Sequence, residues 1–181
     1  MACELTSGLL LNCKDGFAGI QRIWIQQQAD FATGVTLDAT TLEVDALPTA
    51  TIYPFEVVKG TGGFTEATSS ANGGILHTQT VTLVLNKMTS VKRKQLELLA
   101  KNRALVVFVW DKNGKIWMVG RQFGAEITAI EAATGSAAAD LNGYTITFVA
   151  EEPSAAEQLE AYTTTPFDNF VTITIGTSVV D

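Results

Sequence analysis

Charged residues are scarce in this chain: 17% of its 181 residues are Asp, Glu, Lys or Arg, against about 25% in an ordinary soluble domain. Hydrophobic residues make up 46%, which excludes an intrinsically disordered chain. The length fits one domain of roughly 100–200 residues with a sizeable core. We therefore expect a single domain over residues 1–181, with part of its surface covered by a partner.

Long hydrophobic runs are also missing. No stretch approaches the roughly 18 consecutive apolar residues that suggest a membrane-spanning helix. The opening MACELTSGLLLNC has no cationic start before its short apolar run, unlike a secretory signal peptide. We expect a protein that is neither secreted nor inserted in a membrane.

Cysteine and histidine are rare, with two cysteines and one histidine in the chain. Cys3, Cys13 and His77 cannot make up a four-ligand zinc site, so we expect no metal and no cofactor. The spacing permits a Cys3–Cys13 disulfide, whereas a cytosolic origin favours free thiols. His77 lies in an alternating stretch, and no serine, cysteine or acid has a spacing that would make it a catalytic base.

Two further motifs resemble active sites only superficially. Lys59 precedes several glycines, but the order G-x-x-x-x-G-K-[ST] of a phosphate-binding loop and a following helix are missing. Glu151 and Glu152 end a strand, where successive side chains point to opposite faces, so they cannot cooperate like glycosidase carboxylates. We expect a solvated strand end there, and we do not expect an enzyme.

Positive charge is confined to one part of the chain. Between Lys87 and Arg121 nine cations and two acids give a charge of +7. Because the whole chain has a net charge of −7, the rest of the chain carries −14. From Gln122 to Asp181 there are nine acids and neither lysine nor arginine. This asymmetry predicts two faces of opposite charge.

Alternation of apolar and polar residues predicts a mostly β fold. The expected strands are 19–26, 35–47, 51–58, 75–88, the stretches AEITAIEAATG and GYTITFVAEE, and 170–176. Pro54 cannot donate a hydrogen bond, which places its strand at a sheet edge or a bulge. The glycine- and serine-rich stretch at 59–74 is expected to be a mobile loop or hairpin arm that orders on assembly.

Helical patterns are few. One helix is expected at about 90–103, where Ser90 would cap VKRKQLELLAKNR and Val91, Leu98 and Leu99 can share a face. Two helical turns are expected in SAAEQLEAY, which begins with a capping-box pattern.

A long hairpin is expected at 104–121, because Asn113-Gly114 is the strongest short-range hairpin signal. Short strands, one good helix and no βαβ alternation indicate a β-sandwich or partly closed barrel with one flanking helix.

Two parts of the chain resemble a known class of proteins. The opening MACELTSGLLLNCKDGFAGI is similar to the start of structural proteins of tailed bacteriophages, particularly those of marine and Bacteroidetes hosts. The stretches NRALVVFVWDKNGKIWMVGRQFGAEIT and ATGSAAADLNGYTITFVAEEP resemble the long hairpin and the T-G-x-A-x-x-D-x-N-G-Y-x-x-T-F-x-x-E-E pattern of the same proteins. None of these motifs is catalytic.

The resemblance implies a tail tube subunit, a β-sandwich that forms stacked hexameric rings through which DNA passes. Its implied partners are other copies, other phage tail proteins and DNA in passage, and its implied place is the virion tail, assembled in the host cytoplasm without a membrane. The segment SAAEQLEAYTTTPFDN departs from the match. The alternatives are another virion component, such as a capsid-decorating or head–tail connector protein, and a cellular ligand-binding β-sandwich.

Within that interpretation, positive charge belongs at subunit contacts and negative charge at the wall of the conduit. The basic helix could instead form a solvated face or bind phosphates, although the net charge of −7 weakens the latter. The interface candidates are Lys59, Gly62, Gly63, Phe64, Lys92, Arg93, Lys94, Lys101 and Arg103. The candidates for an acidic lumen are Glu126, Glu131, Asp140, Glu151 and Glu152.

Overall fold

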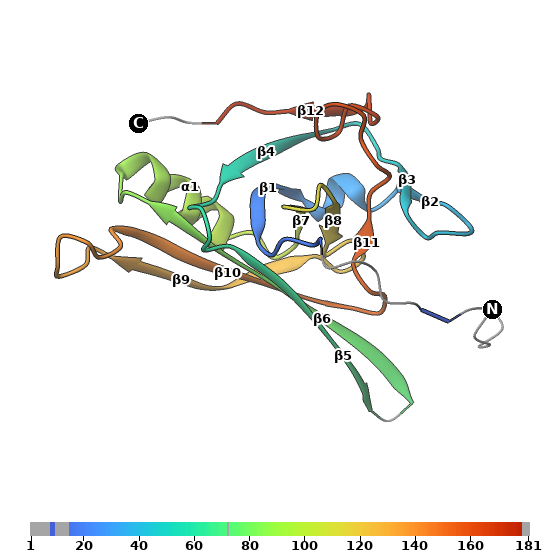
Figure 1. Cartoon of the computed structure of the whole chain (residues 1–181), viewed down its shortest axis with the longest axis horizontal. Helices are drawn as coiled ribbons and strands as arrows, with labels where there is room; N and C mark the ends of the chain where they lie inside the picture. Colours follow the sequence, from blue (N-terminus) through green and yellow to red (C-terminus); the bar gives the residue numbers. More distant parts are fainter. Residues whose placement is uncertain (1–7, 10–14, 72, 179–181) are drawn as a thin grey trace.

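The protein is described by a computed structural model that covers residues 8–9, 15–71 and 73–178 (Figure 1). Cys3 and Cys13 lie outside the described residues. The strands are β1 (Ile20–Gln27), β2 (Thr36–Leu37), β3 (Val44–Ala46), β4 (Ala50–Glu56), β5 (Gly63–Ala71), β6 (Gly74–Asn86), β7 (Leu105–Asp111), β8 (Ile116–Val119), β9 (Ala125–Ala133), β10 (Gly143–Glu152), β11 (Glu157–Gln158) and β12 (Ile173–Ile175). The helices are the 3₁₀ helix η1 (Gln28–Phe31) and α1 (Ser90–Ala100). The fold is therefore mostly β with one α-helix, as the sequence predicts.

Ten strands form one continuous sheet that folds over on itself. Their order is β12-β4-β1-β7-β9-β10-β6-β5, with β8 pairing with β7 and β11. β7 and β9 pair only at Leu105 and Ala125, and the sheet bends there. We call β9, β10, β6 and β5 the arm sheet, and β12, β4, β1, β7, β8 and β11 the body sheet. In Figure 1 the arm sheet runs along the bottom and the body sheet lies above it, the arrangement of a β-sandwich.

The core lies on both faces of the body sheet. Between the two sheets, Ile23 and Val107 of the body sheet pack with Leu83 and Phe148 of the arm sheet. On the other face an aromatic cluster of Trp24, Phe108, Phe167 and Phe170 packs beneath the C-terminal segment. Because β1 and β7 are covered on both faces, β7 reads LVVFVWD without the alternation of a half-exposed strand.

Several expected elements are confirmed. The hairpin at 104–121 is β7 and β8, which turn through Asp111 to Lys115. The alternating stretches form β1, β6, β9 and β10. Pro54 lies in β4 beyond the residues that pair with β12, so its outer side is at a sheet edge, as predicted.

Two expectations about local structure are wrong. The stretch 35–47 is not one strand, because the Asp38 carboxylate accepts the N–H groups of Thr40 and Thr41 and turns the chain between β2 and β3. The segment after Pro153 is not helical, because Glu157 and Gln158 pair with β8 instead. Of the two alternatives for the stretch 59–74, the structure has the hairpin arm, because β5 begins at Gly63 and pairs with β6.

The expected helix is confirmed, but its details differ from the prediction. Thr89 rather than Ser90 caps it, by accepting the N–H of Lys92. Leu96 and Leu99 pack into the core, while Val91 and Leu98 are exposed. The helix is therefore rotated relative to the expected buried face.

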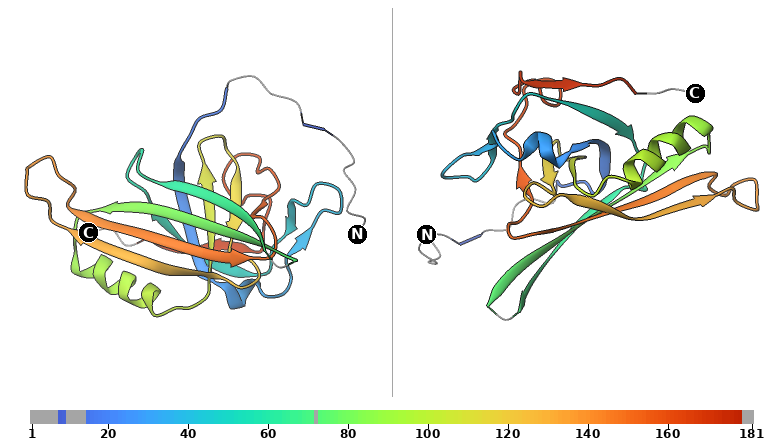
Figure 2. Two further views of the ribbon diagram at one scale, coloured as in Figure 1. Left: turned by 90° about the horizontal axis from the view of Figure 1, so that it is seen from below. Right: turned by 180° about the vertical axis from the view of Figure 1, so that it is seen from behind.

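β5 and β6 form a long hairpin that projects from the body (Figures 1 and 2). β10 pairs with β6 only as far as Glu152, which lies opposite His77. Beyond this point the hairpin consists of two strands alone, paired from Thr68–His77 to Ala71–Gly74. We call this part, residues 68–77, the arm.

Candidate functional site

The arm sheet leaves both of its edges open among the described residues. β5 pairs with β6 alone, so its outer edge from Gly63 to Ala71 has no partner strand. β9 pairs with β7 only at Ala125, so from 127 to 133 its outer edge has no partner strand, although α1 lies beside β9 (Figure 2). Open edges present backbone donors and acceptors that pair readily with a strand of another chain.

The outer face of the arm sheet carries acids and hydroxyl groups but no cation. Alternation along each strand and the pairing register place on this face Glu126, Ala129 and Glu131 of β9, Thr145, Thr147, Val149 and Glu151 of β10, Thr78, Thr80, Thr82 and Val84 of β6, and Thr65, Ala67 and Ser69 of β5. None of the four strands contains a lysine or an arginine. Three of the five expected lumen acids, Glu126, Glu131 and Glu151, thus share one face.

The other two lumen candidates lie elsewhere. Asp140 is in the connection between β9 and β10, where its carboxylate accepts the N–H groups of Ser136 and Ala137 at 2.8 and 2.7 Å. These hydrogen bonds hold the pKa of the Asp140 carboxyl below its usual value. Glu152 points into the protein and is 2% exposed, so the prediction of a solvated strand end is wrong for it.

The buried Glu152 carboxylate binds the backbone of the loop between β8 and β9. It accepts the N–H groups of Gln122, Phe123 and Gly124 at 2.9–3.2 Å. Burial raises the pKa of the Glu152 carboxyl, the three hydrogen bonds oppose that shift, and the nearby Glu157 adds to it. Glu152 is therefore a structural anchor.

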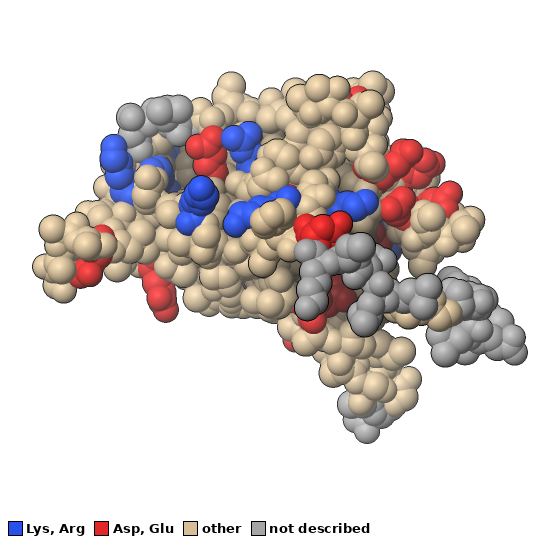
Figure 3. Space-filling view, viewed as in Figure 1, with Lys and Arg blue, Asp and Glu red and all other residues tan. Residues whose placement is uncertain are grey.

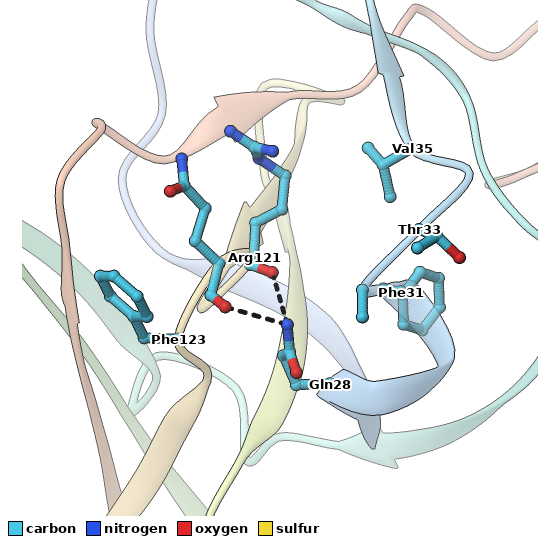
Figure 4. A pocket seen from close by; sticks show the side chains of 8 residues that line it. Gln28, Phe31, Thr33, Val35, Arg121 and Phe123 are labelled. Carbon is cyan, nitrogen blue, oxygen red and sulfur yellow. Dashed lines mark hydrogen bonds between the residues drawn. The ribbon is translucent and has the colours of Figure 1, made fainter.

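Side chains from other elements fix the same loop, residues 120–124. Gln79, which is 1% exposed, accepts the N–H of Gly120. Arg121 binds the carboxylate of Glu157 through Nε at 2.9 Å and Nη2 at 2.8 Å. The Gln28 amide donates to the carbonyl groups of residues 121 and 122, as Figure 4 shows. Glu152, Gln79, Glu157 and Gln28 thus all bind this loop. The alternation of apolar and polar residues within single strands does not predict this hydrogen-bond network.

This loop forms one wall of a hollow of about 490 Å³. Phe31 and Phe123 lie on opposite sides of the hollow, with Gln28 between them (Figure 4). Gln28 and Arg121 are engaged by the loop backbone and by Glu157, respectively. The polar side chains of this wall therefore stabilise the loop.

A second hollow, of about 620 Å³, lies at the other end of β7. Its lining includes Phe17, Ile20, Gly63, Phe64 and Trp117. The interface candidates Gly62, Gly63 and Phe64 therefore belong to this hollow, beside Lys59. Phe64 is half-buried and lies with its ring 6.4 Å from that of Trp117.

The cationic interface candidates lie on and after α1. Arg93 and Lys94 are exposed, as is Arg103 in the connection to β7. Lys92 donates to the Asn86 carbonyl at 2.7 Å and Lys101 binds Glu97 at 3.0 Å. In Figure 3 lysines and arginines gather across the middle of the visible face, and the projecting hairpin shows none. Positive charge is thus separate from the outer face of the arm sheet.

His77 lies at the base of the arm and contacts polar side chains that are not adjacent to it in the sequence. Its Nδ1 atom lies 3.0 Å from the Thr68 hydroxyl and 3.5 Å from a Glu66 carboxylate oxygen. Both neighbours are brought close by pairing across the hairpin. Because both approach the same ring nitrogen, they do not form a nucleophile–histidine–acid relay, which uses the two nitrogens separately.

The described ranges contain neither a cluster suited to a metal ion nor a helix suited to a membrane. No group of three or more His, Cys, Asp or Glu side chains there is arranged to hold a metal ion. No helix in the same part of the chain is long and apolar enough to cross a membrane.

Comparison with known proteins finds no match among protein families, curated proteins or solved structures.

Proposed function

We propose that the chain is a virion structural protein, a tail tube subunit whose copies assemble into stacked rings, hexameric as the sequence resemblance implies, around a conduit for DNA. The observation that carries this proposal is the arm sheet, with two open edges and an outer face that holds three acids and no cation.

The two open edges are suited to pairing with each other in different copies. The four strands β9, β10, β6 and β5 are successively antiparallel, so the two edge strands β9 and β5 run in opposite directions. When β5 of one copy meets β9 of the next, the junction continues the antiparallel alternation. Because the two edges differ, the contact is heterologous, and its repetition closes a ring or extends a filament.

The outer face of the arm sheet suits the wall of a conduit for a polyanion. Duplex DNA carries one charge per about 1.7 Å, and a basic wall would bind it and stop its passage. In a ring of copies Glu126, Glu131 and Glu151 repeat around the bore. Their field is screened by salt over roughly 8 Å, so it acts close to the wall.

The same surface would also suit a second virion role. A capsid-decorating or head–tail connector protein would keep the β fold and the open edges without forming a continuous tube. The experiment that separates these roles is sedimentation velocity at rising protein concentration, combined with negative-stain electron microscopy. The proposal predicts rings and stacked tubes. A strictly monomeric protein at high concentration would contradict it, and closed particles without a through-channel would favour the second role.

A further inference from the structure

Two apolar features lie at opposite ends of β7. At one end the loop 120–124 presents Phe123, whose side chain is 69% exposed. At the other end the hollow of about 620 Å³ opens beside Gly63, which we call the Gly63 hollow. β7 has seven residues, so with a rise of about 3.3 Å per residue the two features are roughly 20 Å apart.

The backbone that carries Phe123 is held firmly. Glu152 accepts the N–H of Phe123 itself at 2.9 Å, and Gln28 donates to the carbonyl of the preceding residue at 3.0 Å. Gly120 and Gly124 have φ values of 75° and 89°, and a Cβ on either would meet backbone atoms within 3 Å. An exposed aromatic residue on a fixed backbone loses little conformational entropy on binding, which is typical of an interface anchor.

The Gly63 hollow has the lining and the space for an aromatic ring. Phe17, 72% exposed, stands at its mouth and is bound to the β7–β8 turn by two hydrogen bonds with Asn113. Phe64 and Trp117 supply aromatic walls. The volume of about 620 Å³ leaves space for a further ring between these walls.

The charges around the two features are complementary. The exposed lysines Lys59 and Lys115 and the half-buried Lys112 surround the Gly63 hollow, where Asp15 is also exposed and Asp111 is bonded to Asn113, Lys115 and Trp117. Near Phe123 the exposed charges are Asp30, Glu126 and Arg103, because Arg121 is paired with Glu157. The hollow thus carries an excess of positive charge and the Phe123 side an excess of negative charge.

We infer that Phe123 of one copy inserts into the Gly63 hollow of a second copy. The separation along β7 prevents a copy from filling its own hollow, so the contact runs head to tail. This inference rests on the proposed self-assembly, because the occupant is another copy. The contact would lie beside the proposed junction of the edges, because Gly63 and Phe64 begin β5 and Phe123 precedes β9.

The test compares the association of three variants by sedimentation velocity. Phe123→Ala removes the inserted ring and Phe17→Ala removes an aromatic side chain that lines the hollow, while Val171→Ala truncates a side chain that is 94% exposed and belongs to neither feature. Removal of an interface anchor weakens association by about tenfold or more. We expect that loss for the first two variants and none for the control, with the thermal transition of each variant unchanged.

A mixture provides the sharper test. Phe123→Ala copies keep an intact hollow and Phe17→Ala copies keep an intact Phe123, so the mixture should regain one contact per unlike pair and associate more tightly than either variant alone. If the wild type assembles and Phe123→Ala assembles equally well, this inference is wrong while self-assembly stands. If the wild type stays monomeric, self-assembly fails together with it. Because Phe123 and Phe17 are both exposed, neither variant is expected to disturb folding.

Discussion

Glu151 and Glu152 are chain neighbours with opposite surroundings. Glu151 lies on the exposed face of the arm sheet, while Glu152 is buried and accepts three backbone N–H groups. Glu152→Ala would leave those donors buried without an acceptor, which should lower the free energy of unfolding by about 2–4 kcal/mol. Glu151→Ala is the matched control and should change it by less than about 0.5 kcal/mol. Urea denaturation of both variants checks this, and equal effects would contradict the role given to Glu152.

The raised pKa of Glu152 also predicts a pH dependence. The native state holds this proton more tightly than the unfolded chain, whose glutamate pKa is near the ordinary 4.5. The contribution to stability is therefore fully present below that value and is lost as the pH rises through the higher folded pKa. Because Glu152→Gln does not titrate, the stability of the wild type relative to this variant should fall from pH 4 to pH 7. A pH-independent difference would show that the three hydrogen bonds cancel the effect of burial.

Sequence reasoning reached part of this site. Alternation places Glu151 and Glu152 on opposite faces, and the structure confirms it. The pattern does not show that the inward position of Glu152 ends beneath the N–H groups of residues 122–124, because those partners come from a distant loop. His77 is similar, since its contacts with Glu66 and Thr68 depend on the register between β5 and β6.

At the scale of elements, the arm is expected to serve assembly rather than stability. An isolated pair of strands is marginally stable in water, and residues 69–71 and 74–76 have no third strand. Replacing residues 69–76 by Asn-Gly would join Thr68 and His77 through a two-residue turn that suits a hairpin. Calorimetry should show an almost unchanged thermal transition, while electron microscopy should show loss of tubes. If the shortened protein unfolds, the arm belongs to the folded core; if tubes persist, it has no part in assembly.

Charge reversal should separate the two charged surfaces. In Glu126→Lys/Glu131→Lys/Glu151→Lys the outer face of the arm sheet becomes basic, and assembly should persist while the tubes retain duplex DNA at low salt. In a phage carrying these changes, genome delivery should slow.

Reversal of Lys92, Arg93 and Lys94 to glutamate should impair assembly first. Arg93→Glu/Lys94→Glu is the cleaner form, because Lys92 also bonds to the Asn86 carbonyl. Filter binding and microscopy check both sets, and normal passage of DNA through the basic tubes would contradict the assignment of the bore.

Elements governed by local pattern were predictable, and elements governed by distant partners were not. The alternation of β6 and the Asn113-Gly114 turn identify their strands without further context. The segment at Glu157 has a capping-box pattern, and Ser154 does donate to Glu157 at 3.1 Å, yet pairing with β8 and the ion pair with Arg121 hold it extended. Tertiary contacts there override local helical preference.

At the scale of the whole molecule, composition and topology point to the same behaviour. The low charged fraction predicts a surface that a partner covers, and the arm sheet supplies two open edges for such a partner. The sequence predicted a sandwich and an acidic C-terminal third, but not the order of strands, since that order depends on which faces pack together. Only the strand order reveals that β9 and β5 are the edges and that Glu126, Glu131 and Glu151 share a face.

Electron cryo-microscopy of the assembled protein tests the central claim most directly. The account predicts rings in which β9 of one copy pairs with β5 of the next, with the outer face of the arm sheet lining the bore and Glu126, Glu131 and Glu151 on its wall. An assembly in which this face lies on the outside, or in which the edges of the arm sheet stay unpaired, would contradict it.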